Sequence, residues 1–258
     1  MDLELAGRVF VVTGGSDGLG LALTERLLIE GAQVAICGRD AGRLESAAGR
    51  LSDHRDRLLT VVADVCEPDD LTGLFDAVRR RWDRLDGLVN NAGAHASAPF
   101  EQVTDEQWQA DLAMRVLAAT RAVERALPSL KVSGGAILNV LSNFAKAPTR
   151  HSMPSSVSRA AGLALTKGLS HDLAKYQIRV NALLIGIIAS GQLARAAAAA
   201  GRDAQELLAE TAQKQQIPLG RAGRAEEFAD IAAFLLSPRA GYITGTALNV
   251  DGGKSPVV

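Results

Sequence analysis

A glycine-rich segment joins an apolar stretch to an amphipathic one near the start of the chain, and this segment limits the possible folds most. Val9–Val12 has the length and composition of a buried strand, and Thr13-Gly-Gly-Ser-Asp-Gly-Leu-Gly20 follows it. Gly14 would permit a tight turn, Gly18 would let the backbone approach a pyrophosphate, and Gly20 would allow close packing of helix on strand. Because free N–H groups at a helix start attract anions, the segment indicates a dinucleotide site.

Strand-length apolar runs alternate with amphipathic stretches of helical length along the whole sequence. Further strands are expected at Gln33–Cys37, Leu59–Ala63, Leu85–Asn90, Ala136–Leu141, Arg179–Leu184 and Ala247–Val250, with helices at Leu19–Glu30, Arg39–Leu51 and Pro68–Trp82. Continuous apolar runs suit strands that are buried on both faces. The alternation predicts an α/β fold, a single Rossmann-type domain over residues 1–258 with a doubly wound parallel sheet.

One segment, at about residues 190–216, interrupts this alternation. It holds an alanine run at Ala196–Ala200 and mixed charges, which favour one or two helices. Since it follows a strand end, we expect it above the carboxyl edge of the sheet, where open α/β sheets bind ligands. It is interpreted as a helical substrate lid; the alternative is a surface helical hairpin.

The bulk properties exclude several classes of partner. A formal net charge of −1 argues against a nucleic acid or a membrane surface. Neither a signal-peptide pattern nor a run of about 18 uncharged apolar residues is present, so a cytoplasmic protein is expected. Cys37 and Cys66 lack metal-ligand spacing, and we expect no metal site.

Several motifs together resemble those of the short-chain dehydrogenase/reductase family, over nearly the whole chain. Besides the glycine segment they are Ala63-Asp-Val65, Asn90-Asn-Ala-Gly93, Arg179-Val-Asn-Ala182 and the stretch from Tyr242-Ile-Thr-Gly to Asp251-Gly-Gly253. The resemblance implies an NAD(P)-dependent oxidoreductase in which Asp64 contacts the adenine amino group. It also implies that Asn90–Gly93 flanks the nicotinamide ribose.

The end of the second strand predicts which dinucleotide is bound. Gly38 stands where a carboxylate would bind a ribose 2′-hydroxyl, and Arg39 beside it suits a 2′-phosphate. NADP is therefore expected rather than NAD, although Asp17 favours the opposite choice. The expected cofactor-binding residues are Gly14, Ser16, Asp17, Gly18, Leu19, Gly20, Arg39, Asp64, Val65, Asn91, Ala92, Gly93, Arg159, Gly186, Ile188 and Ser190.

The catalytic positions depart from the family pattern. The family uses a serine, a tyrosine, a lysine and an asparagine; here Ser142 matches the serine. Ser155 stands at the tyrosine position, Arg159 at the lysine position and Arg115 at the asparagine position. Losing a positioned general acid typically costs 10²–10⁴-fold in rate, so the proton donor is an open question.

Other residues offer partial replacements. His151 is a candidate acid because an imidazole titrates near neutral pH; the alternative is an ordinary loop histidine. Lys146 is a second candidate, with a solvated loop lysine as the alternative, and Ser155 has the alternative of a helix N-cap. The guanidinium groups of Arg115 and Arg159 favour an anionic substrate or a developing enolate. Buried together, they should meet an acidic side chain or an anionic ligand.

Three functions stay open at this stage. The first is an NADP-dependent oxidoreductase acting on a carbonyl or hydroxyl substrate, with Ser142 polarising the carbonyl. The second is a scaffold repurposed for non-redox enolate chemistry, as a lyase, isomerase or decarboxylase. The third is a non-catalytic NADP-binding protein. The family resemblance also implies a homo-oligomer, dimer or homotetramer, paired through helices at Thr104–Leu127 and Ser155–Tyr176.

Overall fold

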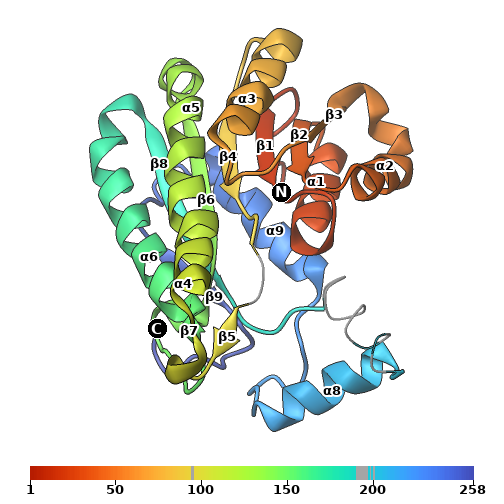
Figure 1. Cartoon of the computed structure of the whole chain (residues 1–258). Coiled ribbons are helices and arrows are strands. Elements are labelled where there is room, and N and C mark those ends of the chain that lie inside the picture. The colour runs from red at the N-terminus through yellow and green to blue at the C-terminus, as the bar shows by residue number, and fades with distance from the viewer. Residues whose placement is uncertain (94–95, 190–196, 198, 200) are drawn as a thin grey trace.

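A computed structural model describes the chain except residues 94–95, 190–196, 198 and 200. Its centre is a parallel sheet with the strand order β3-β2-β1-β4-β6-β8-β9 (Figure 1). The strands are β1 (Val9–Thr13), β2 (Gln33–Gly38), β3 (Leu58–Val62), β4 (Gly87–Asn90), β6 (Gly135–Ser142), β8 (Ile178–Ile185) and β9 (Ala247–Val250). The strand order reverses between β1 and β4, so their carboxyl ends open the crevice where such sheets bind ligands.

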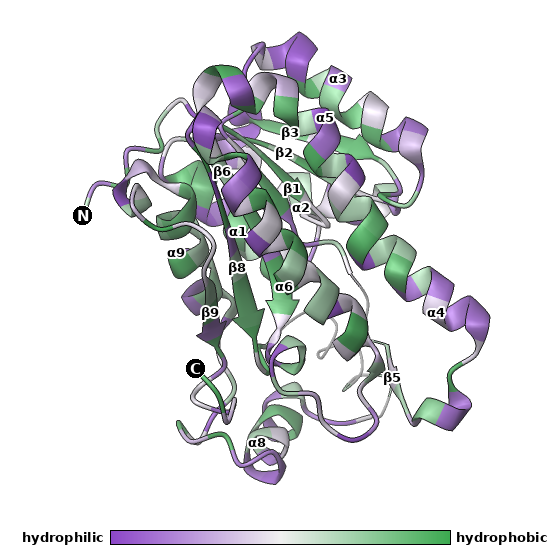
Figure 2. Ribbon diagram, turned by 90° about the vertical axis from the view of Figure 1, so that its left-hand side faces the viewer, coloured by the Kyte–Doolittle hydropathy of each residue, from purple (hydrophilic) through white to green (hydrophobic). Residues whose placement is uncertain are grey.

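Helices cover both faces of the sheet. One face carries α1 (Gly18–Ile29), α2 (Ala41–Arg50) and α9 (Ala225–Leu236), whose side chains share one buried core. The other carries α3 (Pro68–Trp82), α5 (Ala118–Ser133) and α6 (Ser155–Asp172). Figure 2 shows the mostly hydrophobic strands lying between these helices. The two cores hold the strands in register and thereby fix the loops at the carboxyl edge.

A single long helical segment contains a change of helix type. α4 (Asp105–Leu112) begins at a capping box formed by Thr104 and Gln107, and α5 follows it along one rod (Figure 1). Between them the turn η3 (Ala113–Leu117) is π-helical. Isolated π-helical turns within α-helices are frequent at functional sites, and this one contains Arg115.

The predicted doubly wound parallel sheet is confirmed, and each of its strands starts and ends within two residues of the expected position. The expected helix Arg39–Leu51 starts later, at Ala41, because the Asp40 side chain caps it by accepting the Arg43 N–H. The helix expected at Ser155–Tyr176 ends at Asp172, before a 3₁₀ turn. α9 and the short antiparallel pair β5 (Ser97–Ala98) and β7 (Met153–Pro154) were not expected.

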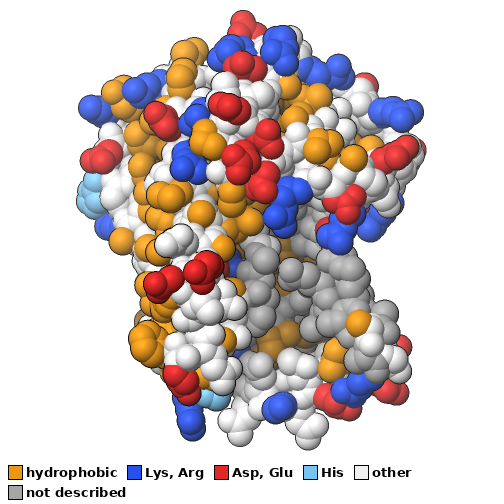
Figure 3. Space-filling model, in the orientation of Figure 1, with side chains coloured by type: hydrophobic (Ala, Val, Ile, Leu, Met, Phe, Trp, Pro, Cys, Tyr) orange, Lys and Arg blue, Asp and Glu red, His pale blue; other side chains and the backbone are white. Residues whose placement is uncertain are grey.

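The segment at 190–216 is described in part. Residues 190–196, 198 and 200 lie outside the described residues, while α8 (Ala204–Lys214) is a helix, as its sequence predicts. In Figure 1, α8 lies at the lower end of the molecule, on the side where β5 and β7 lie. Acidic and basic side chains are interspersed over the face drawn in Figure 3.

No helix among the described residues is long and apolar enough to cross a membrane. The described residues also contain no group of three or more His, Cys, Asp or Glu side chains that could hold a metal ion.

Candidate active site

The glycine turn leads from β1 into α1 through a space that only glycine fits. Gly14 has a φ of +65°, and a Cβ there would lie 3.0 Å from Ala92 Cα. A Cβ on Gly20 would lie 2.3 Å from the carbonyl oxygen of Gly14. Asp17 caps α1 by accepting the Gly18 N–H at 2.7 Å. Leu19 packs against the core on this face, which fixes the start of α1 at the carboxyl edge.

The end of β2 brings the residues predicted for nucleotide choice together. A Cβ on Gly38 would lie 3.1 Å from Ser16 Oγ, so the bare glycine backbone faces that hydroxyl. The Arg39 guanidinium lies 3.6 Å from an Asp64 oxygen, and its side chain is 66% exposed. The other Asp64 oxygen accepts the Cys66 N–H at 2.9 Å. An exposed guanidinium beside a hydroxyl and a glycine is a suitable receptor for a phosphate.

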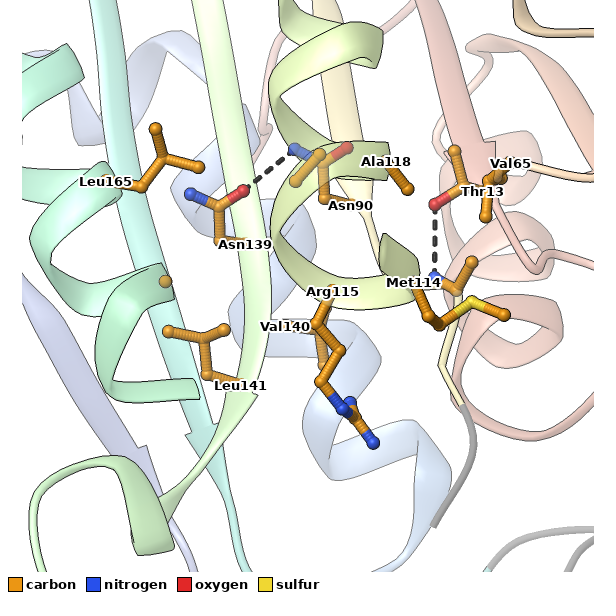
Figure 4. Close-up of a pocket in the computed structure, with 13 residues that line it drawn as sticks. Thr13, Val65, Asn90, Met114, Arg115, Ala118, Asn139, Val140, Leu141 and Leu165 are labelled. Carbon is orange, nitrogen blue, oxygen red and sulfur yellow. Dashed lines mark hydrogen bonds between the residues drawn. The ribbon is translucent and has the colours of Figure 1, made fainter. Parts of the chain in front are cut away.

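Hydrogen bonds tie the end of β4 to the strands on either side. Thr13 Oγ1 accepts the N–H groups of Asn91 and Ala92, and Asn91 Nδ2 donates to the Thr13 carbonyl. Asn90 Nδ2 donates to Asn139 Oδ1 at 2.8 Å (Figure 4). These bonds surround a cavity of about 30 Å³, lined by Thr13, Val65, Asn90, Ala92, Met114, Arg115, Ala118, Ala119, Asn139, Val140, Leu141, Gly162 and Leu165.

Ser142 is the last residue of β6 and is buried there. Its hydroxyl donates to Asn143 Oδ1 at 3.2 Å and accepts the Phe144 N–H at 3.3 Å. Asn143 is held in turn by Asp251, which accepts from its Nδ2 at 3.2 Å. Ser142 is therefore a fixed hydroxyl at the carboxyl end of a central strand, where ligands bind in this fold.

Ser155 and Arg159 form a hydrogen-bonded pair on the first turn of α6. Arg159 Nε donates to Ser155 Oγ at 3.0 Å, and Ser155 is almost fully buried. The interpretation of Ser155 as an N-cap is wrong, because Pro154 occupies that position and Ser155 is the first helical residue. Since its oxygen accepts from Arg159, the hydroxyl hydrogen of Ser155 stays available for another acceptor.

A buried carboxylate links the two helices that carry the arginines. Asp111 Oδ1 accepts from Arg115 Nε at 2.9 Å, and Asp111 Oδ2 accepts from Ser158 Oγ at 2.5 Å. The exposed fractions of the Arg115 and Asp111 side chains are only 6% and 5%. The acidic side chain that was predicted to meet the two cations is thus present for Arg115.

Arg115 also connects the catalytic positions with the Asn90–Gly93 segment. A Cβ on Gly93 would lie 2.9 Å from Arg115 Nη1, so the guanidinium lies against the glycine backbone. In Figure 4 this guanidinium points away from the Asn90–Asn139 pair, in the direction in which β6 runs toward its carboxyl end. Arg115 therefore lies between the proposed nucleotide segment and the first turn of α6.

The charges of this cluster are not balanced. Arg115 and Arg159 supply two positive charges and Asp111 one negative charge. Among the described residues, Arg159 has no carboxylate oxygen within 4.0 Å. Burial, together with the charge of Arg115, lowers the pKa of Arg159 to about 9, and the charge of Asp111 opposes this shift. An anion near Arg159 would stabilise its charged form.

Three further predicted cofactor-binding residues follow β8. A Cβ on Gly186 would lie 2.6 Å from Asp251 Cβ. The backbone beside Ile188 pairs with Gly223, through the Ile187 carbonyl and the Ala189 N–H, which leaves the N–H and carbonyl of Ile188 itself outside these two bonds. Ser190 lies outside the described residues.

The two predicted substitutes for the tyrosine differ in their surroundings. Lys146 Nζ donates to the Ala247 carbonyl at 2.9 Å, so it binds β9 and is neither a solvated lysine nor free to reach the pair Ser155 and Arg159. His151 is exposed, with a φ of +60°, on the loop before β7. Its ring therefore faces solvent next to the site.

Asp111 and Ser158 were not predicted from the sequence as site residues. Asp111 lies four residues before Arg115, a spacing at which helical side chains meet, so this ion pair could have been found. Ser158 lies 47 residues after Asp111, and nothing in the local pattern marks that contact.

Comparisons with known proteins agree with this geometry. A family model described as enoyl-(acyl carrier protein) reductase matches residues 14–255. An uncharacterized oxidoreductase of Mycobacterium bovis is 35% identical, over 97% of this chain and 98% of the relative. The structure of L-sorbose reductase from Gluconobacter frateurii, complexed with NADPH and L-sorbose, is 33% identical with a TM-score of 0.94 and covers 100% of both chains.

A further similar structure is described as having an unusual catalytic site. It is an NADPH-bound short-chain oxidoreductase from Pseudomonas aeruginosa, described as containing an atypical catalytic center. It is 37% identical to this chain, with a TM-score of 0.92, and the match covers 97% of this chain and 98% of the other.

Proposed function

The chain belongs to the short-chain dehydrogenase/reductase family, and on that premise we propose that it is an NADP-dependent oxidoreductase that interconverts a carbonyl and a hydroxyl group beside Ser142. The observation that carries the proposal is the glycine turn, in which no side chain fits at Gly14 or Gly20, at the same carboxyl edge of the sheet as a fixed serine at the end of β6. The NADPH bound to two similar proteins supports the choice of nucleotide.

The residues at the carboxyl edge fit NADP. The first N–H groups of α1 would hold the pyrophosphate, and Arg39 with Ser16 would hold the 2′-phosphate. Asp64, Val65, and the segment Asn91–Gly93 would border the adenine and the nicotinamide ribose, with Arg159 and Ile188 at the nicotinamide end. When bound, NADP(H) supplies or accepts the hydride.

Ser142 would polarise the substrate carbonyl. Its oxygen is already fixed by the Phe144 N–H, so its hydrogen can turn from Asn143 to a substrate oxygen without moving the oxygen atom. A donor held in place before the reaction stabilises developing negative charge at little reorganisation cost.

Ser155 would supply the second hydrogen bond to the same oxygen. Arg159 Nε donates to Ser155 Oγ, which directs the serine hydrogen away from the arginine and makes its loss easier. A serine hydroxyl is a weaker acid than an activated tyrosine. The proton that Ser155 gives to the substrate oxygen must therefore be returned to Ser155 by water. His151, exposed on the adjoining loop, is a candidate to pass it on.

Asp111 would act as a positioning residue. It binds Arg115 and Ser158 and so couples η3 to α6, holding Arg115 against Gly93. The positive charge of Arg159, which no described carboxylate pairs, favours an anionic substrate or a transition state with negative charge on oxygen. We propose α8 as part of a lid over that substrate, because its last residues border the loop before β7.

The same charge excess favours a second candidate, enolate chemistry without net redox change. Two guanidinium groups, of which only Arg115 is paired with Asp111, can stabilise an enolate as well as an alkoxide. This candidate predicts turnover without net consumption of NADPH, which depends on Arg115 and Arg159 more than on Ser142.

Two measurements on the purified protein test the proposal. Calorimetry measures NADPH binding, and an activity assay measures NADPH oxidation with a panel of aldehydes, ketones and keto acids. Ser142→Ala should lower turnover by about 10²–10³-fold and leave NADPH affinity nearly unchanged. Ser156→Ala is the matched control, because among the described residues that buried hydroxyl bonds to Ser152 and Met153 alone, and its loss should leave turnover within a few fold. Tight NADPH binding with no oxidation across the panel would contradict the redox proposal.

A further inference from the structure

A second cavity lies beside the candidate active site. Its volume is about 480 Å³, and the residues that line it are Ser97, Phe144, Thr149, Arg150, His151, Ser152, Lys214, Gln215 and Lys254. They come from β5, the loop between β6 and α6, the end of α8, and the segment after β9. The volume falls in the range of ordinary small-molecule sites.

Basic side chains from three separate parts of the chain meet in this cavity. Arg150, Lys214 and Lys254 line it together with His151, and none of the described lining residues is acidic. Among the described residues, none of these three cations has a carboxylate oxygen within 4.0 Å. In Figure 3, Lys, Arg and His side chains are visible at the lower edge of the molecule, below the place where Figure 1 labels β7.

Lys254 is held in the cavity wall. Its Nζ donates to Gln215 Oε1 and lies 5.4 Å from the centre of the Phe144 ring. Burial lowers the pKa of Lys254, and the charge of Asp251 opposes the shift. The Asp251 carboxylate is already used by Asn143 and by the N–H groups of Gly253 and Ser255. An anion in the cavity would therefore meet a partly buried cation without an acidic partner.

The cavity adjoins Ser142 through the backbone. Phe144, in its wall, donates its N–H to Ser142 Oγ. Ser152, also in the wall, accepts the Ser156 N–H at 2.9 Å, one residue after Ser155. The cavity therefore borders both the strand end that carries Ser142 and the first turn of α6.

We propose that this cavity binds a phosphate monoester group at the far end of the substrate. A phosphate monoester carries a charge of about −1.5 to −2 at neutral pH and three acceptor oxygens, which several converging cations match better than they match a carboxylate. This site is distinct from the arginines of the proposed function. There, Arg39 would bind the nucleotide, and Arg115 and Arg159 would stabilise charge near the reacting oxygen. As a substrate site it rests on the proposed function.

Calorimetric titration of the full chain with inorganic phosphate, glycerol 3-phosphate and glycerol tests the site without requiring turnover. The first two probes should bind and glycerol should not. The double variant Arg150→Gln/Lys214→Gln should weaken phosphate binding at least about tenfold, which is 1.4 kcal/mol, and Lys254→Gln should weaken it in the same direction. Circular dichroism and thermal melting of each variant show that it is folded.

Two controls separate this site from others. Lys131→Gln, which removes an exposed lysine that lies over the Tyr176 ring, should leave the binding of both phosphate probes unchanged. Arg39→Gln should remove only the phosphate that binds at the nucleotide site and leave binding in the basic cavity. If phosphate binding disappears in Arg39→Gln and persists in the double variant, the probe occupies the nucleotide site and the proposal is wrong. Absence of binding at millimolar phosphate also overturns it.

The outcome is independent of the proposed function. Phosphate binding that depends on Arg150 and Lys214, in a protein without NADPH oxidation, would support the anion site and contradict the redox proposal. Oxidation of NADPH by carbonyl compounds in a protein that binds no phosphate would do the reverse.

Discussion

Arg159 keeps the charge of the family's lysine but not its surroundings. Its Nε is bound to Ser155, and among the described residues no carboxylate lies within ion-pair distance. Burial, which disfavours the charged form, lowers the pKa of Arg159 from its ordinary value to about 9. Above pH 9 the unfolded chain therefore still binds a proton that the folded chain has lost, so this group makes stability rise with pH in that range. Below pH 9 its destabilising effect is fully present.

Replacing this cation with an apolar side chain should stabilise the protein in the absence of ligands. Arg159→Met should raise the free energy of unfolding by about 1–4 kcal/mol at pH 7 to 8. The difference from the wild type should narrow as the pH rises above 9. Urea unfolding at a series of pH values measures both effects.

The matched control for that measurement is Arg43→Met. Arg43 is an exposed arginine of α2 whose partner is Asp40, so its loss should change stability by less than about 0.5 kcal/mol at every pH. An Arg159→Met variant less stable than the wild type at pH 7 would show that Arg159 is compensated in the free protein.

At the scale of elements, the π-helical turn η3 decides where Arg115 and Asp111 lie relative to α6. A π-helical turn holds one more residue than an α-helical turn, and each residue rotates a helix by about 100°. Without the extra residue, α4 would turn relative to α5, and Asp111 would leave Ser158. The hydrogen bond between Asp111 on α4 and Ser158 on α6 therefore depends on the π-helical turn.

Deletion of Val116, inside η3, should remove this hydrogen bond. We expect the variant to fold, to bind NADPH within a few fold of the wild-type affinity, and to lose turnover by about 10²-fold or more, because Arg115 and Asp111 are misplaced. Calorimetry and the NADPH oxidation assay measure the two quantities. Val116→Ala, which keeps the residue count, is the control and should retain turnover; retained activity in the deletion variant would refute the role of η3.

The elements also show what the sequence could predict. A helix was predicted at about Pro68–Trp82, and the structure has these bounds, with proline at the first helical position and an apolar face along the helix. The glycine turn was predicted because its backbone constraint is local. The contact between Asp111 and Ser158 was not, because it depends on how α4 and α6 cross in space, and η3 was not, because its residues have no pattern that an α-helix lacks.

At the scale of the whole molecule, exposed apolar side chains gather on the helices that the family resemblance assigns to subunit pairing. Leu112 on α4, Leu117 in η3 and Val157 on α6 are 36%, 46% and 44% exposed. Large apolar side chains on neighbouring helical surfaces are typical of protein interfaces. Oligomerisation stays a prediction, and these three side chains are the residues expected to lie in the contact between subunits.

The prediction is that the protein is a dimer or tetramer and that the double variant Leu117→Glu/Val157→Glu forms a smaller assembly. Burying two carboxylates without partners in an apolar contact is costly, so the variant should dissociate while each subunit keeps its fold. Light scattering coupled to size-exclusion chromatography measures the mass, and circular dichroism checks the fold. Val132→Glu is the control, because Val132 is 89% exposed near the end of α5, away from η3. A monomeric wild type, or a double variant of unchanged mass, would show that these apolar residues face solvent, and that α4 and α6 carry the candidate active site without help from a second subunit.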